Sequence, residues 1–184
     1  MSTNPSVSSA PGVPVVSLAE ARQFLRLEGD NTNDQILSEL IDGVIDDAYL
    51  RFNRSFVNRT LVYTIDHFAP VVRLPRAPLV SVSSITYTDT EGNSQTLSSA
   101  NYQVVTNVEP GYVQPAYGLS WPTTRQQPEA VVITYVAGYG AAASDVPADI
   151  KFWIKSQVMH RFFEREPSLS TGAVPQTLPH HVDD

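Results

Sequence analysis

The stretch that decides the fold is VVITYVAGYGAAASDVPADIKFWIKSQVMHRFF, Val131 to Phe163. Its first six residues favour β structure and place apolar side chains on both faces, which predicts a strand covered on both sides. Gly138 and Gly140 then predict a turn, and Pro147 opens a helix. The stretch therefore reads as a strand, a glycine turn and a long helix.

The helix carries two apolar stripes instead of one. At about 100° per residue, one wide stripe holds Ile150, Trp153, Ile154, Val158 and Phe162, and the opposite side holds Phe152, Met159 and Phe163. An ordinary surface helix has one apolar and one wet face, so two stripes need two partners. Two interpretations stay open. Either the chain's own sheet and other helices cover both stripes, or another subunit covers Phe152, Met159 and Phe163, which we then predict as subunit-interface residues.

Composition limits the class of protein. The chain has 184 residues with 42% hydrophobic content, enough to bury one core, so we expect a single domain with loose ends. It has no cysteine, which excludes a disulfide scaffold and a thiolate metal site. A net charge of −7 argues against tight binding to nucleic-acid phosphates. No apolar run is long enough to cross a membrane and the start does not resemble a signal peptide, so we expect a soluble intracellular product without a membrane partner.

The N-terminal part predicts a tail followed by two helices. Residues 1–15 are expected to form a flexible tail because the first 14 carry no charged side chain and are rich in Ser, Pro and Val. Ser17 and Glu20 match a capping box that starts a short helix. A longer helix is expected to start near Thr32 or Asn33, where Thr32 and Gln35 offer a second capping box. That longer helix is amphipathic, with acidic residues on its polar side.

The middle of the chain switches to the period of β-strands. Alternation from Thr60 to Phe68, a run at 80–89 with an expected bulge between Val82 and Ile85, and a return strand around 95–97 predict an antiparallel sheet. Further strands are expected at 102–106 and 111–114, and residues 115–128 form a loop long enough for a binding role. The predicted fold class is α+β, with N-terminal helices and a C-terminal helix packed with a small, mostly antiparallel sheet. The folded domain is expected at 16–166 and a second flexible tail at 167–184.

Sequence motifs for catalysis, cofactor binding or metal binding are weak. Gly138, Gly140 and Ala143 match a dinucleotide-binding pattern, but the strand that must follow its helix is missing. His180 and His181, with Asp183 and Asp184, lie in the tail, where a metal ion would lack supporting partners. We therefore predict no catalytic, cofactor-binding or metal-binding residues, and a binding or structural role instead of an enzyme.

The order of segments resembles the head-tail connector (adaptor) proteins of long-tailed bacteriophages and related gene-transfer particles. The resemblance rests on VSLAEARQFLR at 16–26, LPRAPLVSVSSITY at 74–87, Asn101–Tyr102, Trp121–Pro122, and VITYVAGYG with VPADIK near the end. It covers residues 15–166, and the order and spacing of these motifs are more specific than any one of them.

The resemblance implies a virion structural protein in the neck, made in the host cytoplasm. It implies a dodecameric ring that docks below the portal protein, extends the DNA channel without binding DNA specifically, and supports the next neck or tail protein. It also implies that the C-terminal segment reaches the portal, and the candidate contacts there are Pro167, Leu169, Val174, Leu178, His180 and His181. The longer tails of this chain leave the partner of each tail open.

Two alternatives remain beside this interpretation. The chain could form another neck ring, a stopper or a tail terminator, which would touch the tail tube instead of the portal. It could also be a small ligand-binding domain or enzyme that uses the 115–128 loop and the Gly138 turn.

Overall fold

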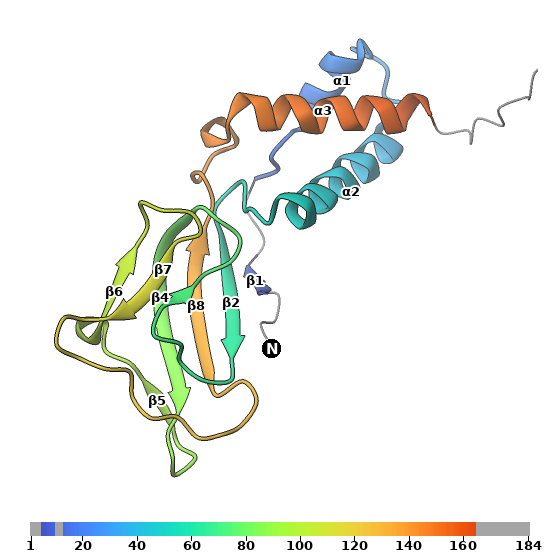
Figure 1. The fold of residues 1–184 in the computed structure, drawn as a ribbon. Helices are drawn as coiled ribbons and strands as arrows, with labels where there is room; N and C mark the ends of the chain where they lie inside the picture. Colours follow the sequence, from blue (N-terminus) through green and yellow to red (C-terminus); the bar gives the residue numbers. More distant parts are fainter. Residues whose placement is uncertain (1–4, 10–12, 165–184) are drawn as a thin grey trace, which may run out of the picture.

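The structure, a computed structural model, describes residues 5–9 and 13–164. Its three helices lie at one end and its two β-sheets at the other (Figure 1). The helices are α1 (Leu18–Leu25), α2 (Asp34–Phe52) and α3 (Ala148–Phe163). The strands are β1 (Ser6–Ser9), β2 (Arg59–Ile65), β3 (Val72–Arg73), β4 (Leu79–Thr88), β5 (Ser94–Thr96), β6 (Tyr102–Val105), β7 (Tyr112–Pro115) and β8 (Val131–Ala137). The α+β class is confirmed.

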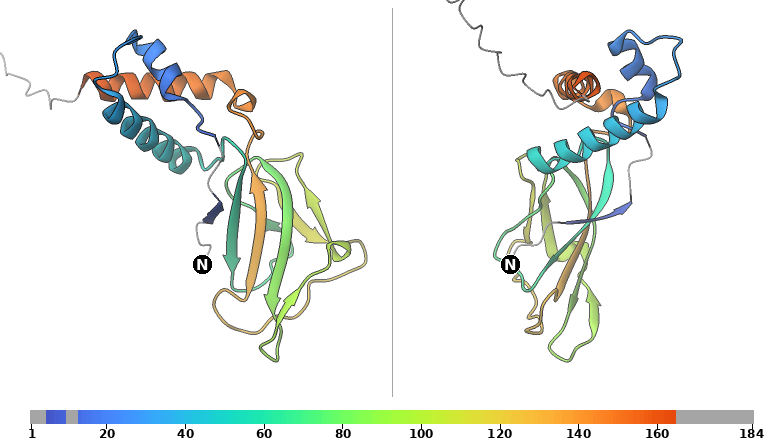
Figure 2. Two further views of the ribbon diagram at one scale, coloured as in Figure 1. Left: turned by 180° about the vertical axis from the view of Figure 1, so that it is seen from behind. Right: turned by 90° about the vertical axis from the view of Figure 1, so that its right-hand side faces the viewer.

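The larger sheet is organised around β8. Its strand order is β1-β2-β8-β4-β5, and every neighbouring pair is antiparallel. The register of β4 against β8 shifts between Val82 and Ser84, which confirms the bulge expected in this strand. Along β8 the side chains alternate between buried and half-buried. The prediction that both faces are covered is wrong, because the helices lie beyond the end of the sheet and not on its outer face (Figure 2).

A second, three-stranded sheet with the order β3-β7-β6 packs against one face of the larger sheet, and we call this the inner face. Val113 from β7 and Val72 from β3 join Leu61, Ile85 and Ile133 from the larger sheet in one buried cluster. Sheets that pack face to face in this way bury the alternate residues of each strand. Two sheets therefore replace the single sheet that the sequence predicted.

The helices have a core of their own. Leu25 of α1, Val44 of α2, and Ile154 and Val158 of α3 belong to one buried cluster that holds no residue of a strand. The single core expected from chain length is thus divided in two. The connection between β2 and α2 joins both parts, since Phe56 and Val57 lie in the helical cluster just before the strand begins.

Part of the predicted N-terminal tail has regular structure. Ser6–Ser9 form β1, an edge strand that pairs with β2, and Val15 and Val16 are buried in the helical core. Pairing with an exposed sheet edge satisfies backbone groups without any apolar periodicity, which is why composition did not indicate this strand. The domain limits at 15, 16 and 166 remain predictions.

The two helix starts differ. At α1, Ser17 and Glu20 form the predicted capping box, in which the Ser17 N–H donates to Glu20 Oε2 at 2.8 Å and the Glu20 N–H donates to Ser17 Oγ at 3.2 Å. At α2, the predicted box on Thr32 is wrong. The N-cap is Asn33, and the Thr32 N–H donates to Asp30 Oδ1 at 2.9 Å in a tight turn.

Candidate interaction surfaces

One side of α3 is fixed to the other two helices. Ile154, Val158 and Phe162 are buried against them. Two ion pairs, one toward each end of α3, also join it to the other helices. Lys151 Nζ lies 2.7 Å from Glu20 Oε1 of α1, and Arg161 Nη2 lies 2.9 Å from Asp47 Oδ2 of α2. The wide stripe predicted for this helix is therefore covered by helices, without the sheet.

The other side of α3 is uncovered. Phe152, Met159 and Phe163 have exposed fractions of 60%, 39% and 67%, and we call these three residues the α3 stripe. Within residues 5–9 and 13–164, neither the sheets nor the other helices bury them, so that part of the chain does not cover both stripes. Coverage by a second copy stays a prediction.

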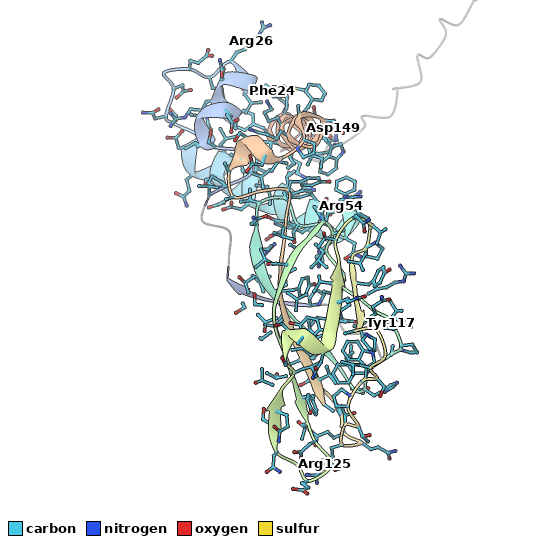
Figure 3. All side chains as sticks on the ribbon, turned by 90° about the vertical axis from the view of Figure 1, so that its left-hand side faces the viewer. Phe24, Arg26, Arg54, Tyr117, Arg125 and Asp149 are labelled. Atoms are coloured by element: carbon cyan, nitrogen blue, oxygen red, sulfur yellow. The ribbon has the colours of Figure 1, made fainter. Side chains whose placement is uncertain are left out.

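Phe24 extends the α3 stripe onto α1. Its ring meets that of Phe152 edge-to-face with centroids 5.9 Å apart, and the Lys155 ammonium lies 5.4 Å from the Phe24 centroid. Figure 3 shows Phe24 at the helical end of the molecule. The structure leaves Phe24 partly exposed. The signal that could have found it is the shortness of α1, since a helix of eight residues cannot cover a helix of 16.

The predicted portal contacts lie outside the described residues. These are Pro167, Leu169, Val174, Leu178, His180 and His181, and the histidines of the candidate metal pair are among them. The described chain ends at Glu164, one residue after α3. The segment that carries these residues thus continues directly from the helix with the exposed stripe.

The glycine turn after β8 serves the close packing of two backbone segments and not the binding of a phosphate. The Gly138 N–H donates to the Pro78 carbonyl at 3.0 Å and the Tyr139 N–H to the Phe56 carbonyl at 2.8 Å, so both donors are already used. A Cβ on Gly138 would lie 2.5 Å from the backbone nitrogen of Asn58. The glycine is required because two backbone segments approach closely here. These two N–H groups are therefore not available to a dinucleotide phosphate.

The 115–128 loop forms the rim of a hollow at the far end of the sheets. Trp121 stacks on Phe68 with ring centroids 4.5 Å apart, and its indole N–H donates to the Ala69 carbonyl at 2.7 Å. Asp66 borders the same hollow and accepts a hydrogen bond from the Glu129 N–H, which lowers the pKa of its carboxyl group. On the same loop, Tyr117 is fully exposed (Figure 3). These contacts fix the rim of the hollow.

The exposed side of α2 is acidic, as the sequence predicted. Glu39, Asp42 and Asp46 are exposed, whereas Asp47 pairs with Arg51 and Arg161. The hydrogen bond from Arg51, followed by the charge of both arginines, holds the pKa of Asp47 below its ordinary value. A surface of this kind repels a polyanion such as DNA.

Two searches concern only the part of the chain that the structure describes. Within residues 5–9 and 13–164, no group of three or more His, Cys, Asp or Glu side chains is placed to hold a metal ion. Within the same ranges, no helix has both the length and the apolar character needed to cross a membrane.

No protein-family model matches the chain, and no curated protein sequence does so either. Solved structures do match. A chain in the neck of an empty gene transfer agent particle, computed with C6 symmetry, is 19% identical with a TM-score of 0.75, over 94% of this chain and 90% of that one. A chain in the virion of a native gene transfer agent particle is 21% identical with a TM-score of 0.74, over 94% and 90%.

A chain in the neck of a native gene transfer agent particle, computed with C12 symmetry, gives a TM-score of 0.75 at 19% identity, over 94% of this chain and 89% of that one. Identities this low establish the fold alone. The resemblance to connector proteins is thereby confirmed for the fold, and this chain shares the architecture of a protein found in the neck of gene transfer agent particles.

Proposed function

We propose that this protein is a structural component of a virion neck, a head-tail adaptor that forms a ring below the portal protein and joins head to tail. The observation that carries the proposal is the shared architecture over almost the whole of both chains, with neighbours found in particle necks. In this role the protein has no catalytic activity. Its place is the interface between head and tail, and it is made in the host cytoplasm.

The α3 stripe supports ring assembly. A closed ring of identical chains needs apolar surface on each copy that a neighbour covers. Phe152, Met159 and Phe163 supply such a surface on a helix that is firmly held on its other side. Twelve copies are the expected number, as the resemblance to connector proteins implies; one matching neck was computed with C12 symmetry and another with C6 symmetry.

The acidic side of α2 supports a channel through which DNA passes without specific binding. Glu39, Asp42 and Asp46 are exposed on one helix of a chain with a net charge of −7. Repulsion of DNA phosphates by such a surface keeps the duplex from sticking as it moves. The portal is the partner on one side of the ring, and the next neck or tail protein is the partner on the other.

Mass photometry and negative-stain microscopy test the proposal. The purified full chain, alone and mixed with the portal of the same particle, is expected to form rings or to add a ring of density to the portal. A chain that stays monomeric in both conditions would overturn ring assembly. Rings that bind the tail tube and ignore the portal would instead identify a stopper or a tail terminator.

A further inference from the structure

Two arginines meet at the junction between the helices and the sheets. Arg59 opens β2, and its guanidinium carbon lies 4.4 Å from the centroid of the Tyr49 ring on α2. Arg76, in the segment that leads to β4, donates from Nη1 to the carbonyl of the same Tyr49. Burial lowers the pKa of Arg76, and the nearby charge of Arg59 lowers it further. Both guanidinium groups thus contact the same residue, Tyr49, and both side chains are half-buried.

Within residues 5–9 and 13–164, neither arginine has a carboxylate partner within ion-pair distance. Most other cations of that part of the chain do have one: Arg22, Arg51, Arg54, Lys151 and Arg161. Asp46 is close enough to act on the pKa of Tyr49, but it forms no ion pair with Arg59 or Arg76. Half-buried like charges are costly unless an anion compensates them.

Buried polar atoms around this pair also lack partners. The Arg59 Nε–H is buried with no acceptor among the described residues, and the Ser55 hydroxyl is buried without a partner there as well. Ser55 is 1% exposed and lies beside the segment of Arg76, because its N–H donates to the Ala77 carbonyl at 2.9 Å. Buried donors without partners are rare in folded proteins and indicate a missing ligand or water.

From this arrangement we propose that Arg59 and Arg76 form an oxyanion site at the junction of the two cores. Guanidinium groups bind carboxylates and tetrahedral oxyanions through paired N–H donors, so the ligand is a carboxylate or a small sulfate-like or phosphate-like group. Two sources have this chemistry: a free anion, or an acidic side chain of another protein chain. The site exists in the single chain and does not depend on ring assembly.

The first experiment measures anion binding by the full-length chain below the concentration at which it assembles. Thermal unfolding is followed in sodium sulfate and in sodium chloride of equal ionic strength. Sulfate is expected to raise the Tm by roughly 3–6 °C over chloride when its concentration is about ten times its Kd. The Arg59→Gln/Arg76→Gln variant is expected to keep only the smaller, general stabilisation that sulfate gives because it is excluded from protein surfaces.

Arg73→Gln is the matched control, since Arg73 is an exposed arginine on β3 of the same charge. It is expected to keep the response to sulfate. If the double variant unfolds before measurement, Arg59→Lys/Arg76→Lys keeps both charges but loses the paired donors, and it should bind sulfate at least about tenfold more weakly. An equal response of the wild type and of the Arg59→Gln/Arg76→Gln variant would overturn the site.

The second experiment separates the two sources of the anion. If a carboxylate of another chain fills the site, sulfate competes with assembly, so it weakens wild-type rings but not rings of the Arg59→Gln/Arg76→Gln variant. If a free anion fills it, sulfate leaves wild-type rings intact or strengthens them. Retention of a short DNA duplex that requires both arginines would overturn the assignment to a carboxylate or small anion.

Discussion

Phe162 and Phe163 are neighbours in the chain with opposite environments, since Phe162 is buried in the helical core and Phe163 is 67% exposed. Substituting Met159 and Phe163 by Ser is expected to change the free energy of unfolding by less than about 1 kcal/mol, because both side chains are exposed. Ring formation should fall steeply if a second copy covers them. Urea unfolding and mass photometry on the same samples measure both effects.

Phe162→Ala is the control for this comparison. It creates a cavity in the core and should cost about 3–5 kcal/mol of stability. Parallel losses of stability and assembly in the Met159→Ser/Phe163→Ser variant would contradict an interface role for the α3 stripe.

Close neighbours require a glycine at position 138, whereas at position 118 only the backbone conformation favours one. Gly138 has φ +149° and would place a Cβ against the Asn58 backbone, whereas Gly118 has φ +78° with nothing within 4 Å. Gly118→Ala is therefore expected to cost about 1–2 kcal/mol, from the left-handed backbone alone. Gly138→Ala should cost roughly 2–6 kcal/mol, because steric overlap adds to backbone strain. Chemical denaturation of both variants checks the difference, and equal values would contradict the close approach.

At the scale of elements, Glu20 links the start of α1 to α3. Burial raises the pKa of Glu20, but hydrogen bonds from Lys151 and Ser17 outweigh burial, so the pKa lies below its ordinary value of 4.5. A carboxyl group with a lowered pKa in the folded state contributes stability above the unfolded pKa, and this contribution is lost as pH falls through the folded pKa. Stability should therefore decrease as pH drops below about 4.5.

Glu20→Gln keeps a hydrogen-bonding side chain at the capping position but removes the charge that pairs with Lys151. Its stability is expected to depend less on pH between about 5 and 3 than that of the wild type. Glu39→Gln, on the exposed side of α2, should leave the wild-type dependence unchanged. An identical pH profile for Glu20→Gln and the wild type would show that this ion pair contributes nothing.

Local signals in the sequence predicted elements well and their assembly poorly. The strand at 131–136, the bulge after Val82 and the Ser17 cap depend on residues close together in the chain, so periodicity and capping rules found them. The division into two cores depends on the direction in which the chain leaves the turn at Gly138 to form α3. No local sequence pattern predicts that direction. Sequence patterns did not predict the Arg59–Arg76 pair for the same reason, since 17 positions separate two residues that meet only in the fold.

At the scale of the whole molecule, helix α3, which carries the exposed α3 stripe, precedes residues 165–184, where the predicted portal contacts lie. Deleting residues 167–184 is expected to leave the Tm unchanged within about 1 °C, because both buried clusters lie before Glu164. Affinity for the portal should fall at least about tenfold, a difference of about 1.4 kcal/mol, if this segment supplies contacts on binding. A chain with the same 18 residues in scrambled order is the control for length and charge. Surface-plasmon measurements on immobilised portal that give equal Kd values for the full, truncated and scrambled chains would place the portal contact elsewhere on the protein.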